Sequence, residues 1–482
     1  MSSRSILLAV LLFTGLLRGG VLWVMRENLN EDRDAYREIA ENLATYRVYG
    51  LGKDGEPRPT AYRPPLYPVM LAKLAGEGLQ VTPVRVAILH WLLGMGTVAL
   101  TWVLAGRMAR CEDSSVQSGV SATRSSSRHT LLCVVASLLI ACDPILLHWS
   151  TYVMTETLAT FLAILALYTL TRFHFDRRPM NASFVGCTLG LAILCRPTFL
   201  PWAGLCGLGL LFLQASGGRQ PPDTSAPREH WLVQSCRRLA NLVTLGLVAA
   251  IIVFPWGYRN YQQFGKPIVT TTHGGYTLYL ANNVYFYDYL RNGSSGLAWN
   301  PAEKRHLPND YDNNPSSFEE VEWGRRWDSY GYNSKNWNRS MEIVCDNALY
   351  DAAVSDLSTN PIVFAYSCLY RIAQLWSPLP HKLSADESDQ RSMLRYAICV
   401  WYLAVYAAAI SGIWQLKGKL LRSPWIWGVL LCLVFTGVHT FYWSNMRMRA
   451  PLMPFVAILA GVGVCCVVNV LRRESLTEAR RH

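Results

Sequence analysis

The sequence predicts an all-α, polytopic membrane protein with about ten transmembrane helices and amphipathic juxtamembrane helices on the extracytoplasmic side. Its 482 residues are 51% hydrophobic and only 16% charged, whereas about a quarter of the residues in a soluble protein are charged. Apolar runs long enough to cross a bilayer, each of about 20 residues, recur along the chain. The basic residues are also spread unevenly among the segments between these runs, which is typical of membrane proteins.

Ten apolar runs are the candidate transmembrane helices. We expect that the first is not a cleavable signal peptide, because Arg18 interrupts it and no small-residue cleavage site follows before the acidic residues. The run 182–195 is short enough to form a re-entrant pair with its neighbour. In chain order, the runs are residues 5–25, 81–106, 130–148, 153–171, 182–195, 198–213, 239–257, 393–415, 424–443 and 450–471.

The net charge of +12 orients the chain and does not indicate a nucleic-acid partner. With the N-terminus inside, the cytoplasmic segments hold 19 Lys and Arg against 7 Asp and Glu, while the outer segments 26–80 and 259–392 hold 20 against 24. Short basic loops stay in the cytoplasm, so we expect an inner (plasma) membrane protein with both termini inside. The cytoplasmic segments are Arg4 and residues 107–129, 172–181, 214–238, 416–423 and 472–482.

This topology divides the chain into four parts. Residues 1–258 form the N-terminal transmembrane helices and include the outer loop 26–80. Residues 259–392 form a second extracytoplasmic segment, 393–471 the C-terminal transmembrane helices, and 472–482 a cytoplasmic tail.

The outer segments predict short helices at the membrane surface. Residues 36–43 place apolar side chains at helical spacing, with Asp34, Glu38 and Glu41 on the opposite face. A second helix follows the sequence YRPPLYP. It is too short and too charged to span the membrane, so we expect it in the interface. The later outer segment predicts one helix ending before Pro361 and an interfacial helix after it. Its aromatic-rich stretch 299–337 is expected to shape an acceptor site.

Charged residues also gather toward the outer ends of the apolar runs. Charges at membrane depth are costly and therefore usually have a function. Their convergence predicts a cavity that holds an anionic headgroup and carries out acid–base chemistry. Taken singly, the acids are also typical of helix starts, the arginines of interfacial anchors, and Asp143 before Pro144 of a helix end. The set comprises Asp34, Asp143 and Glu156 with Arg63, Arg196, Arg259, Arg447 and Arg449.

The order of the motifs resembles a known superfamily over residues 1–470. These motifs are DAYREIAENL, YRPPLYPVMLAKL, STYVMTETL, CRPTFLPW, FPWGYRNY, TNPIVFAYSCLYRIAQLWSP and RMRAPLMPF. They are similar to the GT-C superfamily of polyprenyl-phosphate-dependent glycosyltransferases. The branch is that of dolichyl-phosphate-mannose protein mannosyltransferase-like enzymes, which includes the lipid A aminoarabinose transferases.

The resemblance implies transfer of a sugar from a polyprenyl-phosphate donor to a lipid, glycan or protein acceptor. Asp34 would be the catalytic base and Glu156 the second catalytic acid residue. Members often carry two adjacent acids in the first loop, and here Arg33 separates Asp32 from Asp34, so the base is one of these two. The donor phosphate would bind Arg63, Arg196, Arg259, Arg447 and Arg449, with Asp32, Tyr62, Asp143 and Asn260 as accessory residues.

The chemistry agrees with one carboxylate base. A phosphate leaves as an anion without a strong general acid, unlike the leaving group of a glycosidase, and attack from the opposite face inverts the anomeric centre. No cofactor is required, although Mg²⁺ or Mn²⁺ bridging Asp34, Glu156 and the phosphate would suit oxygen ligands. Two alternatives stay open: a transporter or flippase for the same lipid, and a membrane ligase or polymerase of preassembled glycans.

Overall fold

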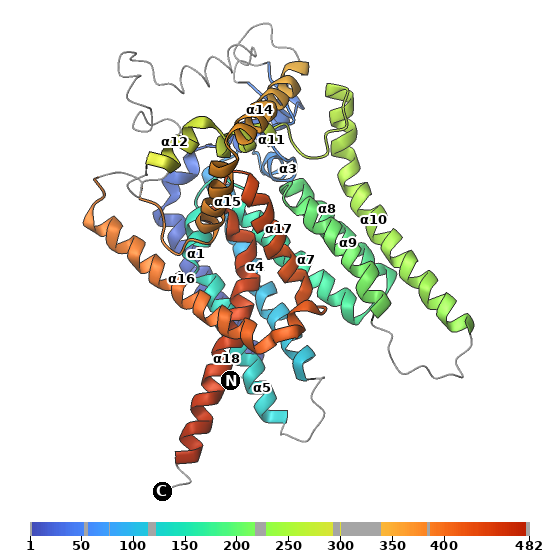
Figure 1. Ribbon diagram of the computed structural model, residues 1–482, viewed down its shortest axis with the longest axis vertical. Helices are drawn as coiled ribbons and strands as arrows, with labels where there is room; N and C mark the ends of the chain where they lie inside the picture. The colour runs from blue at the N-terminus through green and yellow to red at the C-terminus, as the bar shows by residue number, and fades with distance from the viewer. Residues whose placement is uncertain are drawn as a thin grey trace.

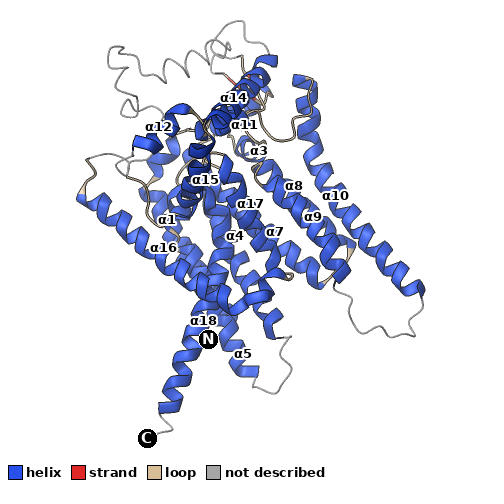
Figure 2. Cartoon of the chain, in the orientation of Figure 1, coloured by secondary structure: helices blue, strands red, loops and turns tan. Residues whose placement is uncertain are grey.

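The computed structural model is almost entirely helical, as the sequence predicts (Figures 1 and 2). It describes residues 2–52, 56–76, 78–113, 122–216, 228–292, 299, 339–382 and 386–478. Within them, a two-residue antiparallel ribbon, β1 (Gly50–Leu51) with β2 (Arg58–Pro59), is an exception to the all-α prediction. Most of the aromatic-rich stretch 299–337 lies outside the described residues.

Each of the ten predicted runs overlaps a helix. Among the described residues, six helices are long and apolar enough to cross a membrane, and four further apolar helices are shorter. The count of ten spans therefore stays a prediction. The helices are α1 (Ser3–Val24), α4 (Pro83–Asp113), α5 (Ala122–Ala141), α7 (Glu156–Phe175), α8 (Pro179–Cys195), α9 (Phe199–Ser216), α10 (Arg228–Phe264), α16 (Asp389–Leu416), α17 (Trp425–Phe441) and α18 (Met453–Glu478).

The third predicted run differs from the structure, because its helix breaks before its end. Helix α5 stops at Ala141, and the short helix α6 (Pro144–Trp149) begins after Asp143. The Asp143 carboxylate caps α6 by accepting a hydrogen bond from the Leu146 N–H at 2.9 Å, and Pro144 takes the first helical position. Both residue types are preferred at those places.

Short helices and the longer helix α14 gather at one end of the molecule, at the top of Figure 1. They are η1 (Arg26–Asn30), α2 (Tyr36–Tyr46), α3 (Leu66–Lys73), α11 (Gly274–Ala281), α12 (Val284–Asn292), α14 (Arg339–Thr359) and α15 (Pro361–Trp376). The predicted helix break before Pro361 is confirmed, whereas α11 and α12 were not predicted. Both chain termini lie toward the opposite end (Figure 1). Two further 3-10 turns are η4 (Lys417–Leu421) and η5 (Met446–Leu452).

Helices α7 and α18 lie at the centre of the bundle. In their most apolar windows, 67% and 78% of residues are buried, against 22% in α1 and 17% in α10. Small residues permit the closest helix contacts: a Cβ at Gly412 of α16 would collide with the Leu459 carbonyl, and one at Gly463 of α18 with the Ala408 carbonyl. Such small-residue contacts are typical of helix packing in membranes. The first residue of α7, Glu156, is therefore held on a central helix.

Candidate active site

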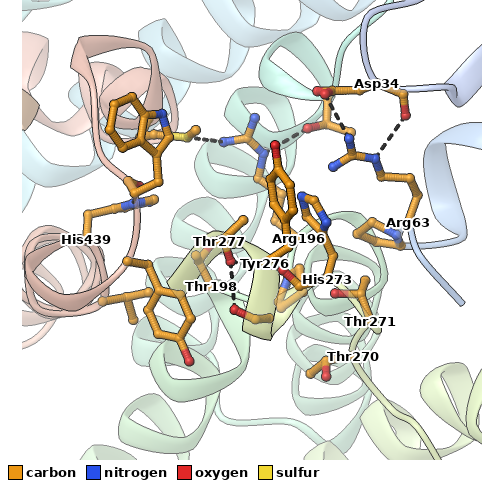
Figure 3. Close-up of a pocket in the computed structure, with 18 of the residues that line it drawn as sticks. Asp34, Arg63, Arg196, Thr198, Thr270, Thr271, His273, Tyr276, Thr277 and His439 are labelled. Atoms are coloured by element: carbon orange, nitrogen blue, oxygen red, sulfur yellow. Dashed lines mark hydrogen bonds and ion pairs between the residues drawn. The ribbon is translucent and has the colours of Figure 1, made fainter. Parts of the chain in front are cut away.

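A cavity of about 560 Å³ opens among the short helices and the adjoining ends of the long ones (Figure 3). We call it the charged cavity. Its volume is typical of a small-molecule site. Six Asp, Glu and Arg residues from five separate stretches of chain line it: Arg33, Asp34, Arg63, Glu156, Arg196 and Arg447.

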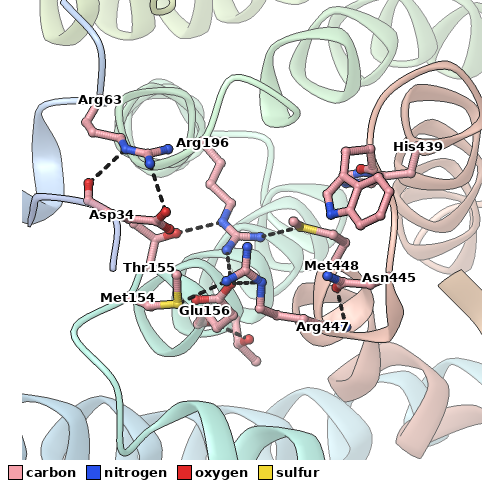
Figure 4. Close-up of polar contacts among 12 residues, drawn as sticks. Asp34, Arg63, Met154, Thr155, Glu156, Arg196, His439, Asn445, Arg447 and Met448 are labelled. Carbon is pink, nitrogen blue, oxygen red and sulfur yellow. Dashed lines mark hydrogen bonds and ion pairs between the residues drawn. The ribbon is translucent and has the colours of Figure 1, made fainter. Parts of the chain in front are cut away.

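Asp34 and Arg63 form one ion pair of the charged cavity (Figure 4). Arg63 Nη2 donates to Asp34 Oδ1 at 2.8 Å, and Arg63 Nε donates to the Asp34 carbonyl at 2.9 Å. Ala35 adopts a left-handed φ of 58°, so the chain turns sharply between Asp34 and α2. The Asp34 side chain remains 24% exposed, and it lines the cavity. This carboxylate is accessible to a substrate.

Glu156, Arg196 and Arg447 form a second, more buried group (Figure 4). Arg196 Nη2 lies 2.6 Å and Arg447 Nε 3.1 Å from the same oxygen, Glu156 Oε1. Arg196 Nε also donates to Thr155 Oγ1 at 2.9 Å. The Glu156 side chain is 2% exposed, against 13% for Arg196 and 19% for Arg447. The carboxylate therefore orients two arginines that face the cavity.

Local sequence places these arginines. Arg196 follows the last residue of α8 in an extended conformation, with φ −147° and ψ 130°, because Pro197 disfavours a helical residue before it. Arg447 lies in η5, whose preceding residue Asn445 accepts a hydrogen bond from the Arg447 N–H at 3.0 Å. Both turns leave the guanidinium groups at helix ends, directed toward the start of α7.

The charged residues that line the cavity leave an excess of positive charge. Four arginines face two carboxylates, so the lining carries a net charge of +2. Arg33 also pairs with the exposed Glu31 at 2.6 Å, and such an exposed pair contributes little. Buried positive charge without a counter-charge is unfavourable. The charged cavity therefore favours an anion, and arginine forks match phosphate oxygens.

Of the five acids between residues 30 and 43, Asp34 lines the charged cavity, whereas the other four are not among its lining residues. Asp32 caps α2, accepting hydrogen bonds from the N–H groups of Arg37 at 3.1 Å and Glu38 at 2.9 Å. Glu38 accepts from the Gly52 N–H and Glu41 from the Val81 N–H. The structure thus distinguishes Asp34, which faces a cavity, from Asp32, which holds a helix start.

The structure does not bring four other candidates to the charged cavity. Arg259 donates to the carbonyls of Thr60 and Tyr49, both at 2.7 Å, and to Asn260 at 2.8 Å. Asn260 in turn donates to the Ile268 carbonyl at 2.7 Å. These two residues tie the chain around residues 49–60 to the end of α10, and neither lines the cavity.

Arg449 and Asp143 are likewise committed elsewhere. Arg449 is fully buried, donates to the carbonyls of Leu375 and Ser377, and lies over the Tyr402 ring at 4.3 Å. Tyr402 donates to Asp143 at 2.9 Å. The two carbonyls engage Arg449 Nη1, while its Nε and Nη2 have no hydrogen-bond partner among the described residues. Sequence alone does not distinguish an arginine held by carbonyl groups from one that binds a phosphate. We therefore leave Asp143, Arg259, Asn260 and Arg449 out of the proposed site.

Neutral residues complete the lining, and most of them were not predicted. Tyr62, a predicted accessory residue, lies edge-on to the His273 ring, with centroids 4.4 Å apart. His439 lines the cavity near the end of α17, and its Nδ1 pairs with the Trp443 carbonyl at 3.0 Å. His273 follows a run of threonines in the sequence TTTHGGYT, which carries no pattern that indicates a site.

The ligand set does not fit a divalent cation. Among the described residues, no group of three or more His, Cys, Asp or Glu side chains converges on one point. Asp34 and Glu156 each accept hydrogen bonds from arginines, which would repel a metal ion placed at the same oxygens.

No protein-family model and no curated protein matches the sequence. Among solved structures, the chain is similar to the oligosaccharyltransferase AglB from Archaeoglobus fulgidus, in complex with an inhibitory peptide and a dolichol-phosphate. The TM-score is 0.47 at 13% identity, over 99% of this chain and 52% of that one. A second Archaeoglobus fulgidus oligosaccharyltransferase structure, with Zn and sulfate, gives 0.47 at 12% identity, over 97% and 49%. This chain spans about half the length of either.

Proposed function

We propose that this protein is a membrane glycosyltransferase that moves a sugar from a polyprenyl-phosphate donor to a lipid, glycan or protein acceptor. The observation that carries the proposal is the charged cavity, where two carboxylates and four arginines from separate stretches line one space. Among the helices that adjoin the cavity, α7 and the segment Met446–Asn469 are long and apolar enough to cross a membrane, and α8, α9 and α17 are shorter apolar helices. This setting suits a donor with a lipid tail. The motif resemblance to the GT-C superfamily points to the same chemistry.

Arg196 and Arg447 are the proposed phosphate ligands. They share one oxygen of Glu156, so the three side chains together keep one positive charge. The phosphodiester of the donor carries one negative charge, and the phosphate monoester that leaves carries up to two. Fixed cations therefore bind the departing group more strongly than the donor, and interactions that strengthen in the transition state increase the rate.

Asp34 is the proposed base. Its Oδ1 accepts from Arg63, whereas no described residue donates a hydrogen bond to Oδ2. Asp34 takes the proton of the acceptor hydroxyl or amine while the acceptor atom attacks the anomeric carbon. The bond from that carbon to the phosphate oxygen breaks, the electron pair stays with the phosphate, and the anomeric centre inverts. Glu156 is a positioning residue, because it is buried and engaged by two arginines.

Transfer by the purified protein tests the proposal. The protein, reconstituted in lipid vesicles, is incubated with labelled polyprenyl-phosphate sugars and membrane acceptors. Asp34→Asn should lower kcat by about 10²- to 10⁴-fold, the usual contribution of a general base. Asp32→Asn is the matched control, since Asn also caps helices, and it should stay within a few-fold of the wild type. The reverse ranking would contradict the assignment of the base.

The same assay distinguishes the alternatives. A flippase would move the labelled lipid across the vesicle membrane with its sugar–phosphate bond intact. A ligase or polymerase would give a product whose mass increases by a preassembled glycan. Either result would replace the proposed transfer of a single sugar.

A further inference from the structure

One wall of the charged cavity carries no ionised side chain. It consists of residues 270–277, of which the last four belong to the start of α11. Figure 3 shows this wall facing the charged residues. Hydroxyl groups and rings make up its surface. The residues of this wall that line the cavity are Thr270, Thr271, His273, Gly274, Tyr276 and Thr277.

His273 is the unusual residue of this wall. Burial, with a further contribution from the Arg63 charge, lowers the pKa of His273 well below its ordinary value, so the ring is neutral. A neutral imidazole offers one N–H donor and one acceptor nitrogen. Among the described residues, the buried Nδ1 of His273 has no hydrogen-bond partner. A buried polar group without a partner is costly, and a ligand that supplies one removes that cost.

The wall is also held firmly in place. The Thr272 N–H donates to the Ala61 carbonyl at 3.1 Å. Glu342 Oε1 accepts from the Ala61 N–H at 2.8 Å and from the Thr272 hydroxyl. One turn further along α14, Asp346 Oδ1 accepts from the Gly275 N–H at 2.7 Å. Two carboxylates of one helix thus position both Arg63's loop and the start of α11.

Close packing fixes the His273 ring itself. It stacks on Tyr276, with centroids 4.6 Å apart and planes at 17°, and contacts the edge of Tyr62 at 4.4 Å. Figure 3 shows the His273 and Tyr276 side chains projecting toward the side of the cavity that holds Arg196 and Arg63. A group attached to a phosphate on Arg196 and facing Asp34 would therefore lie against this wall.

We propose that residues 270–277 form the subsite for the donor sugar, with His273 exchanging hydrogen bonds with its hydroxyl groups, and that this sugar is uncharged. This inference rests on the proposed function. A sugar bearing an ammonium group would add positive charge to a lining that already carries net +2. A sugar bearing a carboxylate would compete with the phosphate for the arginines. A neutral ring with several hydroxyls matches a wall of hydroxyls and neutral rings.

Binding measurements test this inference without any turnover. The full-length protein in lipid nanodiscs is titrated with polyprenyl methyl phosphate, a sugar-free phosphodiester with the same single charge as the donor, and with polyprenyl phosphates that carry neutral hexoses, an amino sugar or a uronic acid. We expect the wild type to bind at least one neutral hexosyl lipid about tenfold more tightly than the sugar-free lipid, as one or two net hydrogen bonds allow.

Three substitutions separate the contributions. His273→Phe keeps a ring but removes both nitrogens, so it should abolish the preference for the hexosyl lipid while leaving affinity for the sugar-free lipid unchanged. His273→Gln restores a donor and an acceptor and should recover part of the preference. His381→Phe is the matched control, because His381 does not line the charged cavity. This variant should keep the full preference for the hexosyl lipid.

Several outcomes would overturn the inference. One is that His273→Phe lowers the affinity for the hexosyl lipid and for the sugar-free lipid equally. The others are that the wild type shows no preference for any neutral hexose, or that it prefers a lipid with a charged sugar. Failure of the proposed function looks different: the hexosyl lipid would bind with the expected preference, yet no sugar would be transferred. Unfolding measurements on each variant show that it is folded.

Discussion

Replacing Glu156 with Gln changes the charge of the cavity while keeping the shape of the side chain. Glu156 is 2% exposed, and its Oε1 holds Arg196 at 2.6 Å and Arg447 at 3.1 Å. Gln keeps an oxygen that accepts from one of these arginines but removes the negative charge. The lining then has four arginines and one carboxylate, so its net charge rises from +2 to +3.

The expected cost follows from the burial of the pair. Removing one partner of a buried ion pair usually destabilises a protein by about 3–5 kcal/mol. Because Gln retains an acceptor oxygen, we expect the lower end of that range, about 3 kcal/mol. Glu31→Gln is the control: its pair with Arg33 is about half exposed, and such pairs contribute at most about 1 kcal/mol.

A phosphate ligand should return much of this stability. A dianion at Arg196 and Arg447 replaces the missing carboxylate, so farnesyl phosphate should stabilise Glu156→Gln more than the wild type. Ligand at 100 times its Kd contributes about 2.7 kcal/mol. Unfolding by SDS titration, with and without farnesyl phosphate, measures both effects. Equal stabilisation of the variant and the wild type by farnesyl phosphate would refute the placement of the phosphate at these arginines.

Three further predictions follow from the same geometry. Arg449→Gln should lower stability by about 2–3 kcal/mol, because it leaves buried carbonyls without partners, yet leave the donor KM unchanged. Arg447→Gln should raise the donor KM, because Arg447 is a proposed phosphate ligand. Steady-state kinetics in which Arg449→Gln raises the donor KM and Arg447→Gln does not would contradict the assignment of the phosphate ligands. The lowered pKa of His273 means that the unfolded chain binds a proton that the folded protein does not. Wild-type stability should therefore be greatest above pH 6.5 and fall below it, and His273→Phe should show a shallower loss in SDS titrations; identical slopes would argue against a neutral His273. Finally, EDTA should leave the transfer rate unchanged, since an arginine engages one oxygen of each carboxylate. A loss of activity in EDTA that Mg²⁺ or Mn²⁺ restores would contradict this prediction.

The helices were predictable because the signal for each is local. Length and hydropathy of a run decide whether it can form an apolar helix, and all ten runs overlap helices. Even the unexpected break in the third run has a local cause, since Asp143 followed by Pro144 is a strong helix-start signal. The amphipathic pattern of residues 36–43 likewise predicted helix α2.

The candidate site was predictable only in part. Asp34, Arg63, Glu156, Arg196 and Arg447 share one cavity, as the convergence of charges suggested. Arg259 and Arg449 lie in stretches of similar composition, but carbonyl groups from distant residues engage them. His273 escaped notice because its burial and its contact with Tyr62 depend on chain segments more than 200 residues apart.

The sequence by itself determined that this chain forms apolar helices joined by polar outer segments, and which ionisable residues stand at their ends. Periodicity and hydropathy express these properties within a few turns of chain. Only the tertiary structure decided which of those residues face a shared cavity and which donate hydrogen bonds to carbonyl groups. The physical reason is that a buried charge must find a partner, and the identity of that partner depends on how distant helices pack.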